Sequence, residues 1–189
     1  MNIANRLTII RVILVPFFLL FLYLDIPFKY LFALLVFITA SITDLYDGKL
    51  ARKYNIVTNF GKFLDPLADK ILVISAMTAF ISMSLAHPIT VILVITREFT
   101  ISGVRLVAAS DSGKIIDANI WGKLKTTLQL VVIIAILAFM QIAELINNNS
   151  FSRAIIIGSN VGMWLVAIVT IISGITYIVQ NAEIFKDIK

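Results

Sequence analysis

Residues 154–182 read AIIIGSNVGMWLVAIVTIISGITYIVQNA and hold no charged side chain over 29 positions. As an α-helix rising about 1.5 Å per residue, this segment is longer than the roughly 30 Å hydrocarbon core of a bilayer. Two further charge-free runs cover 26 residues at 71–96 and 18 residues at 126–143. The segment therefore predicts a transmembrane helix, and the other runs predict that it is one of several.

The composition of the whole chain supports this interpretation. Of its 189 residues, 60% are hydrophobic and 14% are charged. An ordinary soluble domain is about half apolar and about a quarter charged, and a soluble fold of this size could not bury so much apolar surface. These values exclude a soluble globular protein and a disordered one. They predict an all-α, polytopic integral membrane protein with a single domain over residues 1–189.

Six transmembrane helices account for the apolar runs if the two shortest runs, 12–24 and 30–43, extend over neighbouring polar residues. With both termini in the cytoplasm, fourteen of the 16 basic residues lie on the inner side, and Lys29 and Arg153 lie outside. This asymmetry follows the positive-inside rule and predicts a multi-pass protein of the cytoplasmic membrane. The net charge of +5 then favours contact with anionic membrane lipids over nucleic acid. The expected helices are 5–25, 30–54, 62–86, 88–110, 121–146 and 153–181.

The residue types available for metal binding are restricted. The chain has no cysteine and a single histidine, His87. Thiolate and multi-histidine sites are therefore excluded, and any metal must be held by oxygen ligands. Oxygen ligands favour Mg²⁺, Mn²⁺ or Ca²⁺.

Two adjacent stretches carry carboxylates in a chain that otherwise avoids charge, SITDLYDGKLAR at 41–52 and GKFLDPLADK at 61–70. Ionisable groups at membrane depth are costly, so they indicate a functional site. Helical spacing places each set on one face, with small residues between the carboxylates. The first face carries Asp44, Asp47, Gly48 and Ala51, with Arg52 nearby. The second face carries Gly61, Asp65, Ala68 and Asp69.

The short connection between these stretches predicts antiparallel neighbouring helices whose carboxylate faces meet. Four carboxylates cannot all stay ionised together without cations, because each raises the pKa of the others. One or two divalent ions would resolve the repulsion, and two ions suit chemistry at a diphosphate. The alternative is that the aspartates pair with Arg52, Lys62 and Lys70 in a solvated inner loop.

The pattern D-x2-D-G-x2-A-R-x8-G-x3-D-x3-D, matched in full over residues 44–69, resembles the signature of the CDP-alcohol phosphotransferase family. The resemblance implies a membrane enzyme, commonly a homodimer, that transfers a phosphatidyl group from CDP-diacylglycerol to an alcohol and releases CMP. It also implies that Asp69 is the general base. The implied ligands of two Mg²⁺ or Mn²⁺ ions are Asp44, Asp47, Asp65 and Asp69. The implied nucleotide-binding residues are Asp44, Gly48, Ala51, Arg52, Gly61 and Asp65.

A second ionisable cluster bears on the acceptor alcohol. Arg97 and Arg105 are eight residues apart and project to broadly the same side of one helix, whereas Lys123 and Lys125 lie about 200° apart on the next. Such cations suit an acceptor that carries its own phosphate, although lysines at a helix end also snorkel to the membrane surface. Glu98 is a possible partner for one of them. The segments 97–105 and 122–126 look like the branch of the family whose acceptor is sn-glycerol 3-phosphate.

Other readings of the same residues stay open. Relatives with the aspartate pattern use inositol phosphate, serine or phosphatidylglycerol as acceptor. An intramembrane prenyltransferase also acts on a diphosphate through aspartate-rich motifs, but it typically carries them on distant segments. A carboxylate-lined ion transporter explains buried aspartates but not the glycine, alanine and arginine positions. Release of CMP distinguishes a CDP-alcohol phosphotransferase from the other two classes. A prenyltransferase releases pyrophosphate, and a transporter releases nothing.

Overall fold

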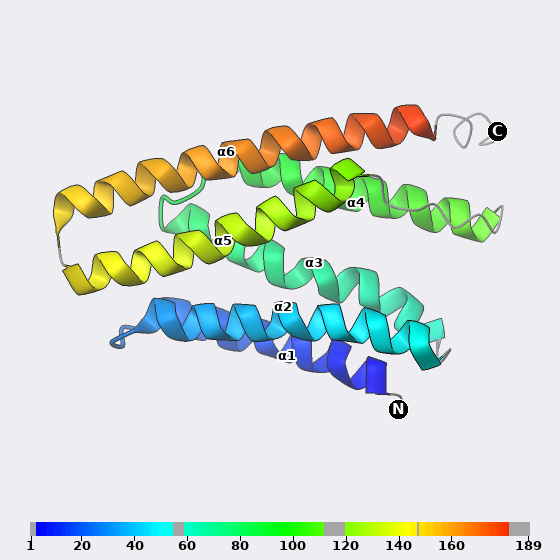
Figure 1. Cartoon of the computed structure of the whole chain (residues 1–189), viewed down its shortest axis with the longest axis horizontal. Helices are drawn as coiled ribbons and strands as arrows, with labels where there is room; N and C mark the ends of the chain where they lie inside the picture. The colour runs from blue at the N-terminus through cyan, green and yellow to red at the C-terminus, as the bar shows by residue number, and fades with distance from the viewer. Residues whose placement is uncertain (1–2, 55–58, 112–119, 147, 182–189) are drawn as a thin grey trace.

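The computed structural model describes the backbone of residues 3–54, 59–111, 120–146 and 148–181 (Figure 1). It describes the side chains of residues 8–43, 68, 70–105, 120–146 and 148–181. All regular structure in these ranges is helical, which confirms the predicted all-α class and the six predicted helices. The helices are α1 (Ile3–Tyr23), α2 (Lys29–Tyr54), α3 (Asn59–Ser82), α4 (Pro88–Asp111), α5 (Ile120–Ile146) and α6 (Asn149–Gln180).

The helices lie along the long axis of the molecule and alternate in direction, so α1 begins and α6 ends at the same end of the bundle (Figure 1). Over the described residues, α1 packs on α2 and α3, α4 packs on α3 and α6, and α5 packs on α2 and α6. Helix α2 touches α3 only lightly in this part of the chain. Helix α5 therefore joins the α1–α2 pair to the α4–α6 pair.

Two helix ends differ from the sequence prediction for local reasons. Helix α3 stops at Ser82 rather than at residue 86, because Ser84 adopts a φ of 61° and the Leu85 amide donates to the Phe80 carbonyl. Helix α6 begins at Asn149 rather than at residue 153. The Asn148 side chain accepts the amides of residues 150 and 151, so it supplies the N-cap that a helix start requires.

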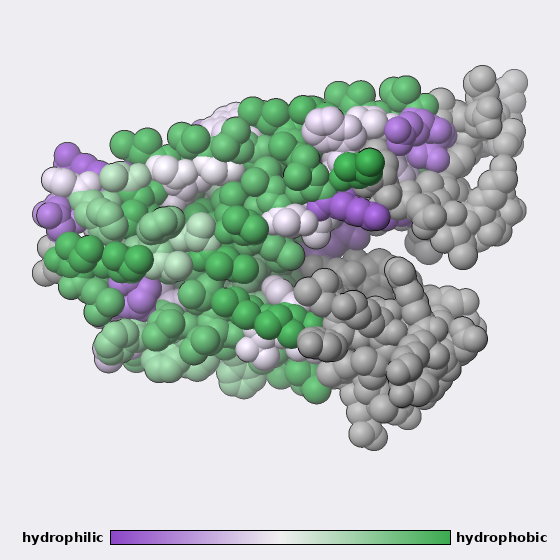
Figure 2. Space-filling model, viewed as in Figure 1, coloured by the Kyte–Doolittle hydropathy of each residue, from purple (hydrophilic) through white to green (hydrophobic). Residues whose placement is uncertain are grey.

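The bundle is apolar both inside and outside. Its core contains the fully buried side chains of Phe18, Phe37, Phe80, Met77 and Leu137. Apolar side chains also cover most of the coloured surface in Figure 2. Within the described ranges, α5 and α6 are long and apolar enough to cross a membrane, and shorter apolar helices occur in α1, α2 and α3. An apolar exterior over an apolar core is the arrangement expected of a protein that sits in lipid.

Candidate functional site

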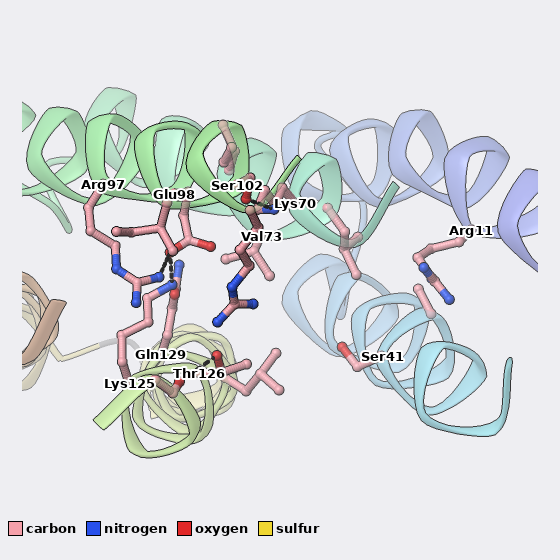
Figure 3. Close-up of a pocket in the computed structure, with 17 residues that line it drawn as sticks. Arg11, Ser41, Lys70, Val73, Arg97, Glu98, Ser102, Lys125, Thr126 and Gln129 are labelled. Atoms are coloured by element: carbon pink, nitrogen blue, oxygen red, sulfur yellow. Dashed lines mark hydrogen bonds and ion pairs between the residues drawn. The ribbon is translucent and has the colours of Figure 1, made fainter. Parts of the chain in front are cut away.

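A cavity of about 300 Å³ lies within the bundle and is lined by described residues of α1 to α5 (Figure 3). It lies beside the middle of α4 and the first turns of α5, toward the end of the bundle where α1 begins. Its lining carries five basic side chains and one carboxylate, a high density of charge for an apolar bundle. These side chains are Arg11, Lys70, Arg97, Glu98, Arg105 and Lys125.

Helical periodicity explains why α4 contributes most of this charge. Positions 97, 98, 101, 102 and 105 all line the cavity, at intervals that return to one face of a helix. On α5, positions 125, 126 and 129 do the same. The cavity is therefore formed where one polar face of α4 meets one polar face of α5.

Glu98 is the electrostatic centre of the described lining. Its Oε1 accepts from the Arg97 Nη1 at 2.8 Å and from the Lys125 Nζ at 2.6 Å. The Lys125 side chain is 3% exposed and the Glu98 side chain 14% exposed. One partly buried carboxylate therefore compensates a buried lysine from α5 and a partly buried arginine from α4, and the set keeps a net positive charge.

The other cations are held by different partners. The Arg105 guanidinium lies over the ring of Tyr177 from α6, 5.1 Å from the ring centroid. The Lys70 ammonium donates to the Ser102 hydroxyl at 2.5 Å. Arg11, from α1, lies beyond Ser41 at the far side of the cavity from Arg97 (Figure 3). An anion in this cavity would be surrounded by positive charge from several helices.

Three of the four residues expected to bind an acceptor phosphate meet at this cavity. Arg97, Arg105 and Lys125 line it, whereas Lys123 is exposed and is not part of the lining. The two lysines point apart because residues two positions apart on a helix differ by about 200° in direction.

Sequence reasoning did not single out Arg11 and Lys70 as cavity residues. Arg11 is 2% exposed in a helix that is otherwise almost uncharged. An arginine within an apolar helix is the sequence feature that could have identified it. Lys70 directly follows the second aspartate stretch. Its position beside Asp69 is the sequence feature that could have identified Lys70 as a cavity residue.

The four aspartates lie on the predicted helices, and their side chains lie outside the described part of the chain. Asp44 and Asp47 fall on α2 with Gly48, Ala51 and Arg52, and Asp65 and Asp69 fall on α3 with Gly61. The cavity lining reaches both stretches along the chain. Ser41 precedes Asp44 by three residues, and Val73 follows Asp69 by four. These intervals place Ser41 on the helix face of α2 that carries Asp44, and Val73 on the face of α3 that carries Asp69.

The chain is similar to one protein family and to several bacterial proteins that share one name. The model of the CDP-alcohol phosphatidyltransferase family matches residues 1–172. A protein of Bacillus subtilis is 36% identical, with 98% of this chain and 97% of that protein covered. A protein of Haemophilus influenzae is 39% identical over 94% of this chain and 91% of its own length. An Escherichia coli protein is 43% identical over 69% of this chain and 73% of its own length. All three are named CDP-diacylglycerol--glycerol-3-phosphate 3-phosphatidyltransferase.

Proposed function

The chain belongs to the CDP-alcohol phosphatidyltransferase family, and from that premise we propose that it transfers the phosphatidyl group of CDP-diacylglycerol to sn-glycerol 3-phosphate. The products are phosphatidylglycerophosphate and CMP. The observation that carries the choice of acceptor is the meeting of Arg97, Arg105 and Lys125 at one cavity, which Ser41 and Lys70 from the two aspartate stretches also line. Relatives named for this reaction are similar over nearly the whole chain.

In the proposed reaction, a free hydroxyl of the acceptor attacks the β-phosphorus of CDP-diacylglycerol. A new P–O bond forms to that hydroxyl oxygen, and the bond from the β-phosphorus to the bridging oxygen breaks. CMP leaves with the bridging oxygen, and Asp69 takes the hydroxyl proton. A base placed at the attacking hydroxyl contributes roughly 10²–10⁴ to the rate.

The donor atoms of the aspartate stretches fit a hard divalent cation, because carboxylate oxygens are the ligands that Mg²⁺ and Mn²⁺ prefer. Asp44, Asp47, Asp65 and Asp69 would hold two such ions. The ions would supply neutralising charge to the diphosphate and to the departing CMP oxygen. The proposed nucleotide-binding residues are Asp44, Gly48, Ala51, Arg52, Gly61 and Asp65.

The acceptor's phosphate is assigned to the cationic cavity. Arg97, Arg105 and Lys125 line it, and charge-assisted hydrogen bonds from such groups are stronger than neutral ones. Arg11 and Lys70 add positive charge to the same lining. Lys123 is left out of this assignment because its exposed side chain is not part of the lining.

We also propose that the protein is a multi-pass homodimer of the cytoplasmic membrane with both termini in the cytoplasm. The alternating helices bring the start of α1 and the end of α6 to one end of the bundle (Figure 1), as an even number of spans requires. The cavity lies toward that end, where a soluble phosphate ester and the nucleotide of a lipid could both arrive. Lys29 begins α2, and Arg153 lies four residues after the start of α6, at the opposite end.

Release of CMP by the purified protein tests the proposed function. The protein in detergent receives CDP-diacylglycerol, Mg²⁺ and one acceptor at a time: glycerol 3-phosphate, inositol 1-phosphate, serine or phosphatidylglycerol. We expect CMP release with glycerol 3-phosphate only. Release with another acceptor would retain the family chemistry and overturn the acceptor assignment. Absence of CMP with every acceptor, in a folded and metal-loaded sample, would contradict the proposed reaction.

Replacing Arg105 with Ala tests the acceptor site directly. The substitution removes a charged donor group, and hydrogen bonds to charged groups contribute about 1.5–3 kcal/mol. We expect the KM for glycerol 3-phosphate to rise by roughly ten- to a hundredfold, with little change in the KM for CDP-diacylglycerol. Arg153→Ala is the matched control, because Arg153 is exposed at the opposite end of the bundle. An unchanged KM for glycerol 3-phosphate in Arg105→Ala would remove Arg105 from the acceptor site.

A further inference from the structure

One face of α6 packs directly behind the two cavity arginines of α4. Its residues are Ser173, Gly174 and Tyr177, at intervals that return to the same side of a helix. All described residues that line the cavity come from α1 to α5. This face of α6 therefore contacts the two arginines and is not itself part of the described lining.

The contact with Arg97 is close and directional. The Arg97 Nη2 donates to the Ser173 hydroxyl at 2.7 Å. A Cβ atom at Gly174 would lie 3.1 Å from the Arg97 Cγ, which is tighter than ordinary van der Waals contact. Glycine at this position therefore lets α6 approach the stem of Arg97.

The contact with Arg105 is made by an aromatic ring. The Arg105 guanidinium carbon lies 5.1 Å from the centroid of the Tyr177 ring, within the range of a cation–π interaction. Tyr177 is 1% exposed, and its hydroxyl has no hydrogen-bond partner among the described residues. The ring face, rather than the hydroxyl, is thus the part of Tyr177 that Arg105 meets.

Arg105 differs from the other cations of α4 and α5 in how its charge is compensated. Arg97 and Lys125 share the carboxylate of Glu98. Within the described part of the chain, Arg105 forms no ion pair, and its buried Nε has no hydrogen-bond partner. A ring face supports a guanidinium without occupying its N–H donors. Arg105 can therefore be held in place and still offer its donors to an anion.

We propose that Tyr177 is a positioning residue for the acceptor: its ring holds the Arg105 guanidinium in the orientation that receives the acceptor's phosphate. The inference rests on the proposed function, since it concerns how that site binds sn-glycerol 3-phosphate. Tyr177 follows residue 172, where the match to the family model ends.

Two substitutions at Tyr177 separate the ring from the hydroxyl. Tyr177→Phe keeps the ring face, and we expect its KM for glycerol 3-phosphate to stay within about twofold of wild type. Tyr177→Leu removes the ring, and we expect that KM to rise about tenfold, in line with a desolvated cation–π contact. Both variants should keep kcat and the KM for CDP-diacylglycerol within about twofold of wild type. If Phe weakens acceptor binding as much as Leu does, or if Leu lowers kcat and leaves both KM values unchanged, the inference is wrong.

A double-variant cycle tests whether Tyr177 acts through Arg105. In an Arg105→Ala background, Tyr177→Leu should raise the KM for glycerol 3-phosphate by less than about twofold further, because the supported group is gone. A full additional tenfold effect would show an independent structural role and overturn the inference. Should the Leu variant not fold, Tyr177→Met takes its place, because an unbranched side chain fills irregular space without a ring. Thermal unfolding of each variant in detergent verifies the fold.

The outcomes also separate the inference from the function on which it rests. A wild-type protein that releases no CMP with glycerol 3-phosphate would overturn the proposed function, and the inference would fall with it. A wild-type protein that is active, together with a Tyr177→Leu variant of unchanged acceptor KM, would overturn the inference alone.

Discussion

Replacing Asp69 with Asn is expected to lower the rate of phosphatidyl transfer by roughly 10²–10⁴ while CDP-diacylglycerol still binds. Asparagine matches aspartate in size but cannot accept a proton from the attacking hydroxyl. The remaining aspartates, Asp44, Asp47 and Asp65, would still provide oxygen ligands for the divalent ions. The chemical step should therefore suffer far more than lipid binding.

Single-turnover CMP release and equilibrium binding of CDP-diacylglycerol together measure this effect. Asp25→Asn is the control, because Asp25 is fully exposed in the turn between α1 and α2, at the opposite end of the bundle from the cavity. Turnover close to wild type in Asp69→Asn would remove Asp69 from the role of base. Loss of both turnover and lipid binding would leave Asp69 with its metal-binding role and contradict its role as the base.

Glu98→Ala should produce the largest loss of stability among the described cavity residues. The substitution leaves Arg97 and Lys125 close together without the carboxylate that both contact at 2.8 and 2.6 Å. Removing one partner of a buried ion pair costs about 3–5 kcal/mol, because the remaining charge is left buried and uncompensated. We expect a clear fall in the thermal unfolding midpoint of the detergent-solubilised protein and a weaker affinity for glycerol 3-phosphate.

Two further variants make the Glu98 result specific. The double variant Glu98→Leu/Lys125→Met removes both charges, so it should be more stable than Glu98→Ala although it lacks the same carboxylate. Asp25→Ala breaks an exposed ion pair with Lys29 and should leave the unfolding temperature unchanged. A Glu98→Ala protein that unfolds at the wild-type temperature would contradict the view that Glu98 compensates the buried Lys125 and the partly buried Arg97.

The helices could be predicted because their signal is local. Charge-free runs and the polar turns between them are properties of neighbouring residues, and all six helices occur where the sequence places them. The helix ends were less predictable. The start of α6 depends on the side chain of Asn148 accepting two amides, and the end of α3 depends on the left-handed backbone at Ser84. Both depend on which of several allowed local conformations the chain adopts.

The part of the candidate site that lies on a single helix could be predicted from the sequence. The interval of eight residues between Arg97 and Arg105 predicts a shared side of α4, and both side chains line the cavity. The interval of two residues between Lys123 and Lys125 predicts only that the lysines point apart. Which of them faces the cavity depends on how α5 is rotated against α4, and Lys125 is the one that meets Glu98.

By itself, the sequence determined the all-helical membrane class, the order of the six helices and the spacing of four aspartates along two of them. Each of these follows from hydrophobic length or from the 3.6-residue period, which act within one segment. Only the tertiary structure decided that Glu98 lies between Arg97 and Lys125, and that Ser173 and Tyr177 of α6 support the arginines of α4. Periodicity specifies the face of a helix on which a residue lies, but packing between distant segments decides what that face meets.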